Sequence, residues 1–199
     1  MSKIITFCFT SEKAKELYKN EPPQYETPFA SGFDLRAVDF CCKKYVDSYG
    51  YEVNYDVCNF SKEVVGHLGE KRLLLDAKSR VLVKTGIRIS MPIMENEIMH
   101  LEICSRSGLS LTNGVFVLNA PGIVDNDYRG ELGVILHNAG NKAVAINIGD
   151  RIAQGVFNPL QQCIWQKVSE EDFEQNFCNT QRGSGGFGST GKSLNLNNI

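Results

Sequence analysis

The sequence has no long hydrophobic run, no excess of basic residues and no signal peptide. Its 21 Lys and Arg are balanced by 23 Asp and Glu, for a formal net charge of -2. Binding to nucleic-acid phosphates usually needs a strong basic excess, so direct nucleic-acid binding is not expected. No apolar run approaches a membrane span, and the N-terminus lacks the apolar stretch and cleavage site of a secretory leader. These absences predict a soluble intracellular protein without a membrane partner, cytoplasmic or, if the source is eukaryotic or viral, nuclear.

The sequence also lacks CxxC pairs. Its seven cysteines are odd in number and scattered, and without a secretory signal we expect reduced thiols rather than a disulfide framework. The alternative is a zinc site, whose ligands would be Cys41, Cys42, Cys58 and His67. Their spacing fits no common zinc module, so no metal held by protein ligands is predicted.

What is present is a succession of short segments with the period of β-strands. Residues 4–9 are rich in β-branched and aromatic residues. Apolar and polar residues alternate over 87–91, 132–136 and 144–148. Turn residues separate the segments, and the only helix expected is a short one over 11–20, ended by Pro22 and Pro23. Since 42% of the 199 residues are hydrophobic, the chain can build a core, and the pattern predicts an all-β barrel or sandwich.

Two stretches break this pattern. Residues 39–72 mix Cys, Lys, Tyr and Asn in irregular order, and we expect a surface excursion from the barrel that leaves the chemistry untouched. Residues 179–199 include five glycines between Gly183 and Gly191, too few apolar groups to pack, and should be mobile. The expected organisation is a β-barrel domain over 1–178 and a glycine-rich tail over 179–199.

Five short motifs follow one another along the chain. They are ASGFDLRA (30–37), SRSGLS (105–110), NAPGIVDNDYRGELGV (119–134), GDRIAQ (149–154) and RGSGGFGSTG (182–191). Taken singly, each is more often structural than functional. A DYRG turn, for example, is usually a surface turn.

The residues in these motifs nevertheless share a chemistry. Arg106, Ser107 and Gly108 place a cation, a hydroxyl and an accessible amide within a few residues, which suits a phosphate. The tail adds an arginine, hydroxyls and glycine amides, and its Phe187 has no core to enter but could stack on a base. Asp125 follows two apolar residues, so its carboxylate can emerge at a strand end as a general base.

Residues 186–193 (GFGSTGKS) match the phosphate-binding pattern GxxxxGK[ST]. That pattern is meaningful only between a strand and a helix of a parallel α/β fold. Only six residues follow it here, too few for the helix, and the rest of the chain has the pattern of an all-β protein. We therefore reject an ATPase of the P-loop class.

Together and in this order, the five motifs resemble those of the trimeric dUTPase family. The resemblance covers about residues 22–38 and 73–191. It implies a distorted jelly-roll barrel, hydrolysis of dUTP to dUMP and pyrophosphate, and a homotrimer with shared active sites. It also implies roles in nucleotide metabolism, keeping uracil out of DNA and supplying dUMP for thymidylate synthesis.

The third motif would then supply the chemistry and the base recognition. Asp125 would be the base that deprotonates water for attack on the α-phosphorus, and Tyr128 would pack under the deoxyribose and exclude a 2′-hydroxyl. The uracil hairpin would be lined by Asn119, Gly122, Ile123, Val124 and Gly133. Mispairing of cytosine with this hairpin would cost about 1–3 kcal/mol per buried group.

The other motifs would hold the triphosphate. The α- and β-phosphates would contact Arg106, Ser107, Gly108 and Gln154. The tail would reach the γ-phosphate and cover the uracil through Arg182, Phe187, Gly188, Ser189 and Thr190. Asp34 would act in support, near the phosphate-binding arginine or the water shell of the metal. Mg²⁺ would be bound through the triphosphate and water, with no direct protein ligand.

Three departures and three rival functions accompany this resemblance. Residues 39–72 exceed the usual link after the first motif, Lys84 and Cys104 stand where prolines are common, and Phe33 replaces a frequent tyrosine. A dCTP deaminase would share the barrel but would need a catalytic glutamate in the third motif. A nucleotide-sensing binding protein would bind dUTP without turnover, and a structural jelly-roll would leave the five motifs unexplained.

Overall fold

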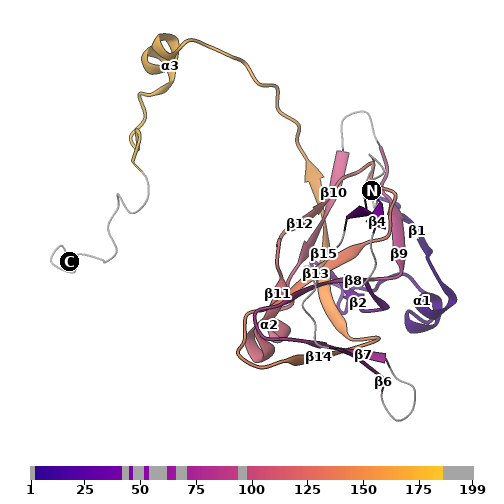
Figure 1. Ribbon diagram of the computed structural model, residues 1–199. Coiled ribbons are helices and arrows are strands. Elements are labelled where there is room, and N and C mark those ends of the chain that lie inside the picture. The colour runs from indigo at the N-terminus through magenta and orange to yellow at the C-terminus, as the bar shows by residue number, and fades with distance from the viewer. Residues whose placement is uncertain are drawn as a thin grey trace, which may run out of the picture. The chain divides into compact units, whose positions relative to one another are not determined.

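The computed structural model describes residues 3–41, 45–46, 52–53, 62–65, 71–93 and 98–185. It divides into two compact units, Met1–Gln161 and Gln162–Ile199, shown as a ribbon in Figure 1. Within the described residues, no helix has the length and apolar character needed to cross a membrane.

The first unit consists almost entirely of strands. Its elements are β1 (Thr6–Phe9), α1 (Glu12–Leu17), β2 (Phe33–Arg36), β3 (Asp39–Cys41), β4 (Tyr45–Val46), β5 (Glu52–Val53), β6 (Lys62–Val65), β7 (Lys71–Leu75), β8 (Arg80–Lys84), β9 (Ile87–Ser90), β10 (Ile98–Cys104), α2 (Ser107–Asn113), β11 (Val115–Val117), β12 (Gly122–Val124), β13 (Gly133–Asn138), β14 (Val144–Asn147) and β15 (Arg151–Leu160). The second unit contains α3 (Glu170–Phe177). The predicted all-β class is confirmed.

Two four-stranded antiparallel sheets form the body of the first unit. Their strand orders are β12-β10-β15-β2 and β11-β13-β8-β3. A three-stranded sheet, β14-β7-β6, and the pairs β1-β9 and β4-β5 complete it. Neighbours in sheet order are far apart in sequence, as where β15 lies between β10 and β2 (Figure 1). Side chains from both four-stranded sheets enter a single apolar core.

The period of two in the sequence corresponds to burial in the strands. In β10, Met99, Leu101 and Ile103 are buried while the residues between them are half-buried. In β13, Val134 and Leu136 enter the same core. Because alternate side chains point to opposite faces of a sheet, these strands each have one face on the core.

The predicted helix near the N-terminus is confirmed as the shorter α1. The hydroxyl of Ser11 accepts a hydrogen bond from the amide of Ala14 (3.1 Å), a typical N-cap contact. Ala14 is fully buried. After the helix, Tyr18 accepts from the amide of Arg36 (2.9 Å), and burial raises the pKa of Tyr18 to about 12. The helix is therefore anchored to the end of β2.

Several elements were not predicted. Helix α2 ends at Gly114, which adopts φ of 66° as the cap. Helix α3 begins after Ser169, whose hydroxyl accepts from the amide of Asp172 (3.1 Å). The described parts of 39–72 include strands that extend two sheets, since β3 pairs with β8 and β6 pairs with β7. The intervening residues of this segment lie largely outside the described ones.

The second unit exposes large apolar side chains. Ile164 is 99% exposed and Trp165, the single tryptophan of the sequence, is 97% exposed. In α3, Phe173 and Phe177 stack on each other with ring centroids 5.5 Å apart, and both remain about half exposed.

One buried amide links two turns of the barrel. The Nδ2 of Asn138 donates to the carbonyls of Leu75 (2.9 Å) and Lys142 (2.8 Å), and its Oδ1 accepts from the amide of Gly140 (2.9 Å). Asn138 is fully buried. Its side chain thus satisfies backbone groups that would otherwise be left unpaired after β7 and between β13 and β14.

We expect Asn138→Ala to destabilise the barrel strongly. Each orphaned buried group costs about 1–3 kcal/mol, so the loss should reach about 3 kcal/mol or more. For a chain of this length the corresponding fall in Tm is about 6–12 °C, measurable by circular dichroism. Asn141→Ala is the control, because Asn141 is exposed in the same turn. Equal Tm values for the two variants would contradict this role of Asn138.

Candidate active site

A charged cluster forms where β2, β15 and the end of β10 meet. Asp34 Oδ1 lies 2.8 Å from Arg106 Nε, and Asp34 Oδ2 lies 3.0 Å from Arg151 Nη1. The same Arg151 nitrogen lies 3.1 Å from Glu26 Oε1. Strand register creates this meeting, because Gln154 stands opposite Asp34 on one side and opposite Cys104 on the other. The first, second and fourth motifs therefore converge within one chain.

Hydrogen bonds fix the loop that carries Arg106. The Nε2 of Gln154 donates to the carbonyl of Ser105 (2.9 Å), and the hydroxyl of Ser105 accepts from the amide of Val117 (2.9 Å). Arg106 Nη1 also donates to the carbonyl of Arg151 (3.1 Å). Gln154 thus holds the second motif through the Ser105 carbonyl. The half-exposed guanidinium of Arg106 is held by Asp34 and by the Arg151 carbonyl.

Ser107 and Gly108 begin α2 directly after this arginine. The first amides of a helix have no acceptor inside the helix, so they are free to bind an anion. The space around Gly108 is open, since a Cβ at this position would meet nothing within 4 Å. The arrangement suits the close approach of a phosphate to backbone and hydroxyl groups.

A separate pocket of about 300 Å³ lies at the third motif. Of the predicted residues, it is lined by Asn119, Ile123, Val124, Asp125, Tyr128 and Gly133. Leu82, Glu131, Leu132 and Ile135 complete the lining. The predicted Gly122 starts β12 beside it, where a Cβ would lie 3.1 Å from the Asn119 amide nitrogen. The structure therefore gathers the third-motif residues around one hollow.

Tyr128 is fixed in this pocket by close packing. Its hydroxyl donates to the carbonyl of Glu131 (3.0 Å), and a Cβ on Gly130 would lie 2.2 Å from the same hydroxyl oxygen. Only glycine at position 130 lets the tyrosine fold back in this way. The ring remains 45% exposed and so has a surface free for a ligand.

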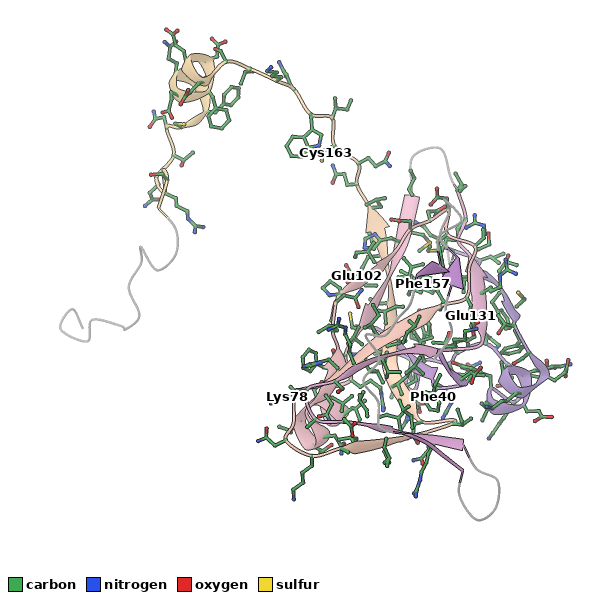
Figure 2. All side chains as sticks on the ribbon, viewed as in Figure 1. Phe40, Lys78, Glu102, Glu131, Phe157 and Cys163 are labelled. Atoms are coloured by element: carbon green, nitrogen blue, oxygen red, sulfur yellow. The ribbon has the colours of Figure 1, made fainter. Side chains whose placement is uncertain are left out.

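Two carboxylates line the pocket, and they differ in their partners. Glu131, labelled in Figure 2, accepts from the amide of Gly86 (2.8 Å) and lies 3.6 Å from Lys84 Nζ. In the described part of the chain, the Asp125 carboxylate has no such partner. Of the two, the exposed Asp125 carboxylate is therefore the one that a ligand or a water molecule can approach.

Sequence reasoning missed the contributions of Arg151, Glu26 and Glu131. Arg151 lies in the GDRIAQ motif, and its positive charge was a signal that it could pair with Asp34. Glu26 and Glu131 contact partners far away in the sequence, so no local pattern marks them.

The structure describes only part of the predicted tail. Arg182 belongs to the second unit, where its Nε donates to the carbonyl of Gly185 (2.8 Å). Phe187, Gly188, Ser189 and Thr190 lie outside the described residues.

The described residues offer no cage for a metal. Among them, no group of three or more His, Cys, Asp or Glu side chains is arranged to hold an ion. Both oxygens of Asp34 face arginines. Of the alternative zinc ligands, Cys42, Cys58 and His67 lie outside the described residues.

Another hollow, of about 380 Å³, lies elsewhere on the first unit. Its lining is mainly apolar and includes Phe7, Pro22, Ile89 and Phe157, with Lys3 and Tyr25 among the other residues. It contains no carboxylate. Of the described site residues that the sequence predicts in the barrel, none lies in this hollow.

Known proteins were compared with the sequence and the fold. The family model of dUTPase matches residues 69–191. Deoxyuridine 5′-triphosphate nucleotidohydrolase of Heliobacterium modesticaldum is 39% identical over 169 residues, which cover 85% of this chain and 88% of the relative. The enzyme of that description from Helicobacter pylori strain 26695 is 37% identical over 171 residues, or 86% and 89% of the two chains.

Solved structures agree in fold. A mutant dUTPase of Staphylococcus bacteriophage 80alpha with dUpNHpp has a TM-score of 0.63 at 19% identity, covering 96% of this chain and 100% of that one. The dUTPase of Streptococcus mutans has a TM-score of 0.53 at 22% identity, covering 80% and 98%. The jelly-roll-like barrel is thus the fold of these enzymes, and with the sequence matches it follows that the chain belongs to the dUTPase family.

Proposed function

We propose that this protein is a dUTP pyrophosphatase that hydrolyses dUTP to dUMP and pyrophosphate. The observation that carries this proposal is the pocket in which Asp125 and Tyr128 lie beside β12, the strand that pairs with β10. The relatives that the sequence matches are named deoxyuridine 5′-triphosphate nucleotidohydrolases. Such an activity would keep uracil out of DNA and supply dUMP for thymidylate synthesis.

The third-motif pocket recognises uracil through backbone groups of its wall. Gly122 and Gly133 remove side chains from two points of the wall, and a Cβ on Gly133 would lie 2.9 Å from Leu82 Cδ1. Backbone groups can then approach the base edge and pair with N3–H and O4 of uracil. Cytosine inverts this donor and acceptor pattern, at a cost of about 1–3 kcal/mol for each mispaired buried group. Backbone this close to the base would also clash with the methyl group of thymine.

Tyr128 selects the deoxyribose. Its hydroxyl is engaged by Glu131, so the ring is held in one orientation and presents its free face to the sugar. A ribose 2′-hydroxyl would have to enter the space that this ring fills. UTP is excluded by this contact, whereas the deoxyribose packs against it.

The charged cluster holds the triphosphate. Arg106, Ser107, Gly108 and Gln154 bind the α- and β-phosphates, with Asp34 keeping the Arg106 guanidinium in place. The tail residues Arg182, Phe187, Gly188, Ser189 and Thr190 close over the γ-phosphate and the uracil. Hydrogen bonds from a charged guanidinium to phosphate are about twice as strong as neutral ones, which suits a substrate with several negative charges.

Mg²⁺ fits this donor set only through the substrate. The ion keeps several waters and commonly binds substrate phosphates with few protein carboxylates. Asp34 faces two arginines, so it is suited to the water shell of the ion rather than to direct ligation. When bound, Mg²⁺ neutralises phosphate charge and favours in-line geometry.

Asp125 supplies the general base. Its carboxylate accepts a proton from a water molecule while the water oxygen forms a bond to the α-phosphorus. The bond between the α-phosphorus and the α,β-bridging oxygen breaks, and pyrophosphate leaves with that oxygen and the electron pair of the broken bond. Proton transfer by a positioned group contributes about 10²–10⁴-fold to the rate.

Deamination of dCTP is the enzymatic alternative, and the pocket disfavours it. A deaminase would need a free glutamate in the third motif. Glu131 is the glutamate present, and its carboxylate is occupied by the Gly86 amide and Lys84. It braces the turn between β8 and β9, so it is not free for acid–base chemistry.

We further infer a homotrimer with shared sites. Arg106 and Gln154 do not line the third-motif pocket of their own chain. This separation suits a site that a second chain completes. In this arrangement the strands of the first unit form the barrel, and the tail over 179–199 closes a site that belongs to a neighbouring copy. The glycine-rich tail needs such an external partner, because it has too few apolar groups to pack on itself.

Asp125→Asn tests the base. The substitution preserves size and hydrogen bonding but removes basicity, so kcat should fall about 10²–10⁴-fold. Pyrophosphate release from dUTP measures kcat, and calorimetry with dUpNHpp should show that binding survives. The matched control is Asp39→Asn, because Asp39 is exposed and its Oδ1 accepts from the Phe40 amide, a contact the amide oxygen can keep. Near-normal turnover by Asp125→Asn would refute the assignment.

Mixed trimers test the shared site. Asp125→Asn and a chain truncated before Arg182 should each be nearly inactive alone. If base and tail in one site come from different chains, random mixing by unfolding and refolding should restore about a quarter of the sites, since two even choices must both succeed. Native mass spectrometry confirms that mixed trimers have formed. No gain in activity from such mixtures would mean that each chain completes its own site.

A further inference from the structure

A buried amide lies directly beside the proposed base. Asn126 is 9% exposed and follows Asp125 in the loop between β12 and β13. Its Nδ2 donates to the carbonyl of Met99 (3.0 Å) and to that of Pro92 (3.3 Å). Pro92 follows β9 and Met99 lies in β10, so one side chain ties the loop to both ends of the β9–β10 connection.

The orientation of this amide is chemically fixed. Two carbonyl oxygens can only accept, so the NH₂ group must face them and the side-chain oxygen must face away. Within the described residues, Oδ1 of Asn126 has no hydrogen-bond partner. A buried acceptor left unpaired lowers stability, and such groups need a reason to persist in a native fold. Here the two donated bonds hold the amide although its oxygen is unsatisfied.

Arginines hold the same loop through its backbone. Arg129 Nη1 donates to the carbonyls of Asn126 (2.7 Å) and Tyr128 (2.9 Å). Arg88 of β9, in turn, donates from Nε to the carbonyl of Arg129 (2.7 Å). The backbone from 126 to 129 is therefore bound by its own arginine and by a neighbouring strand.

These contacts matter because the base has no support of its own. In the part of the chain that the structure describes, no group hydrogen-bonds the carboxylate of Asp125. Its main-chain carbonyl accepts a hydrogen bond from the Tyr128 amide (3.1 Å). The direction of the carboxylate consequently depends on the position of the backbone that carries it.

We propose that Asn126 is a positioning residue for hydrolysis, which, together with the link from Arg88 to Arg129, aims Asp125 at the attacking water. This inference rests on the proposed function. A base displaced from its water raises the barrier to reaction without removing contacts that bind the nucleotide. Misplacement by about 1 Å can cost about 10²-fold in rate.

The test compares Asn126→Ala and Arg88→Ala with the unchanged full-length chain, with dUTP and Mg²⁺. We expect kcat to fall about 10–100-fold in Asn126→Ala. The fall in Arg88→Ala should be smaller, about threefold to tenfold, because this exposed side chain holds the loop only through Arg129. KM for dUTP and Kd for dUpNHpp should stay within about threefold, since loss of kcat alone marks an effect on the transition state.

Asn138→Ala separates positioning from general loss of stability. It also removes buried amide-to-carbonyl bonds, but at the far end of β13, about 17 Å from Gly133 at about 3.4 Å per residue. Below its Tm, its kcat should stay within about twofold of that of the unchanged chain. Equal losses of kcat in Asn126→Ala and Asn138→Ala would leave no positioning role for Asn126.

Other outcomes also decide the question. A folded Asn126→Ala with kcat within about threefold of normal would overturn the proposal, and so would a loss of dUpNHpp binding as large as the loss of kcat. If Asn126→Ala does not fold, Arg88→Ala decides, and an unchanged kcat there overturns it. An inactive unchanged chain would overturn the proposed function itself, whereas an active chain with unaffected variants would overturn only the positioning role.

Discussion

The pairing of the Asp34 carboxylate with two arginines is the interaction on which the charged cluster depends. Arg106 Nε lies 2.8 Å and Arg151 Nη1 lies 3.0 Å from the oxygens of this carboxylate, so the two guanidinium groups are close together. Two guanidinium groups so near would repel each other without a negative charge between them. The register of β2, β15 and β10 places that negative charge beside the two arginines. The electrostatics of the site therefore depend on the strand pairing.

The other half of the site is built on different physics. Around the third-motif pocket, glycines bring backbone close to neighbouring side chains, and Tyr128 folds back over Gly130. In the proposed function, shape and backbone hydrogen bonding select the base and sugar, whereas fixed charges hold the phosphates. A single substrate that carries both an uncharged base and a triphosphate is suited to such a division.

Much of this could be predicted from local pattern. The alternation in β10 and β13 and the cap at Ser11 follow from residue type and spacing. The grouping of third-motif residues around Asp125 was expected from the resemblance to the dUTPase family. Helix α2 could not be predicted, because its seven residues include serines, a threonine and an asparagine, which have weak helix propensity. A glycine in the left-handed conformation ends this helix.

The bulge between Arg151 and Ala153 leaves Ile152 and Ala153 both buried, which breaks the simple alternation. The buried amide of Asn126 looked like any polar loop residue, since only long-range contacts distinguish it. The roles of Phe187 to Thr190 stay predictions.

The single tryptophan has a consequence for spectroscopy. Trp165 is almost fully exposed in the second unit, outside the core that holds the strands together. We expect its fluorescence emission to be that of an indole in water, so unfolding of the barrel by itself should barely shift it. Tyrosine absorbance and far-ultraviolet dichroism report on the barrel instead. A blue shift of the tryptophan emission would therefore be a selective optical marker of burial of the segment after β15, separable from any change in the core.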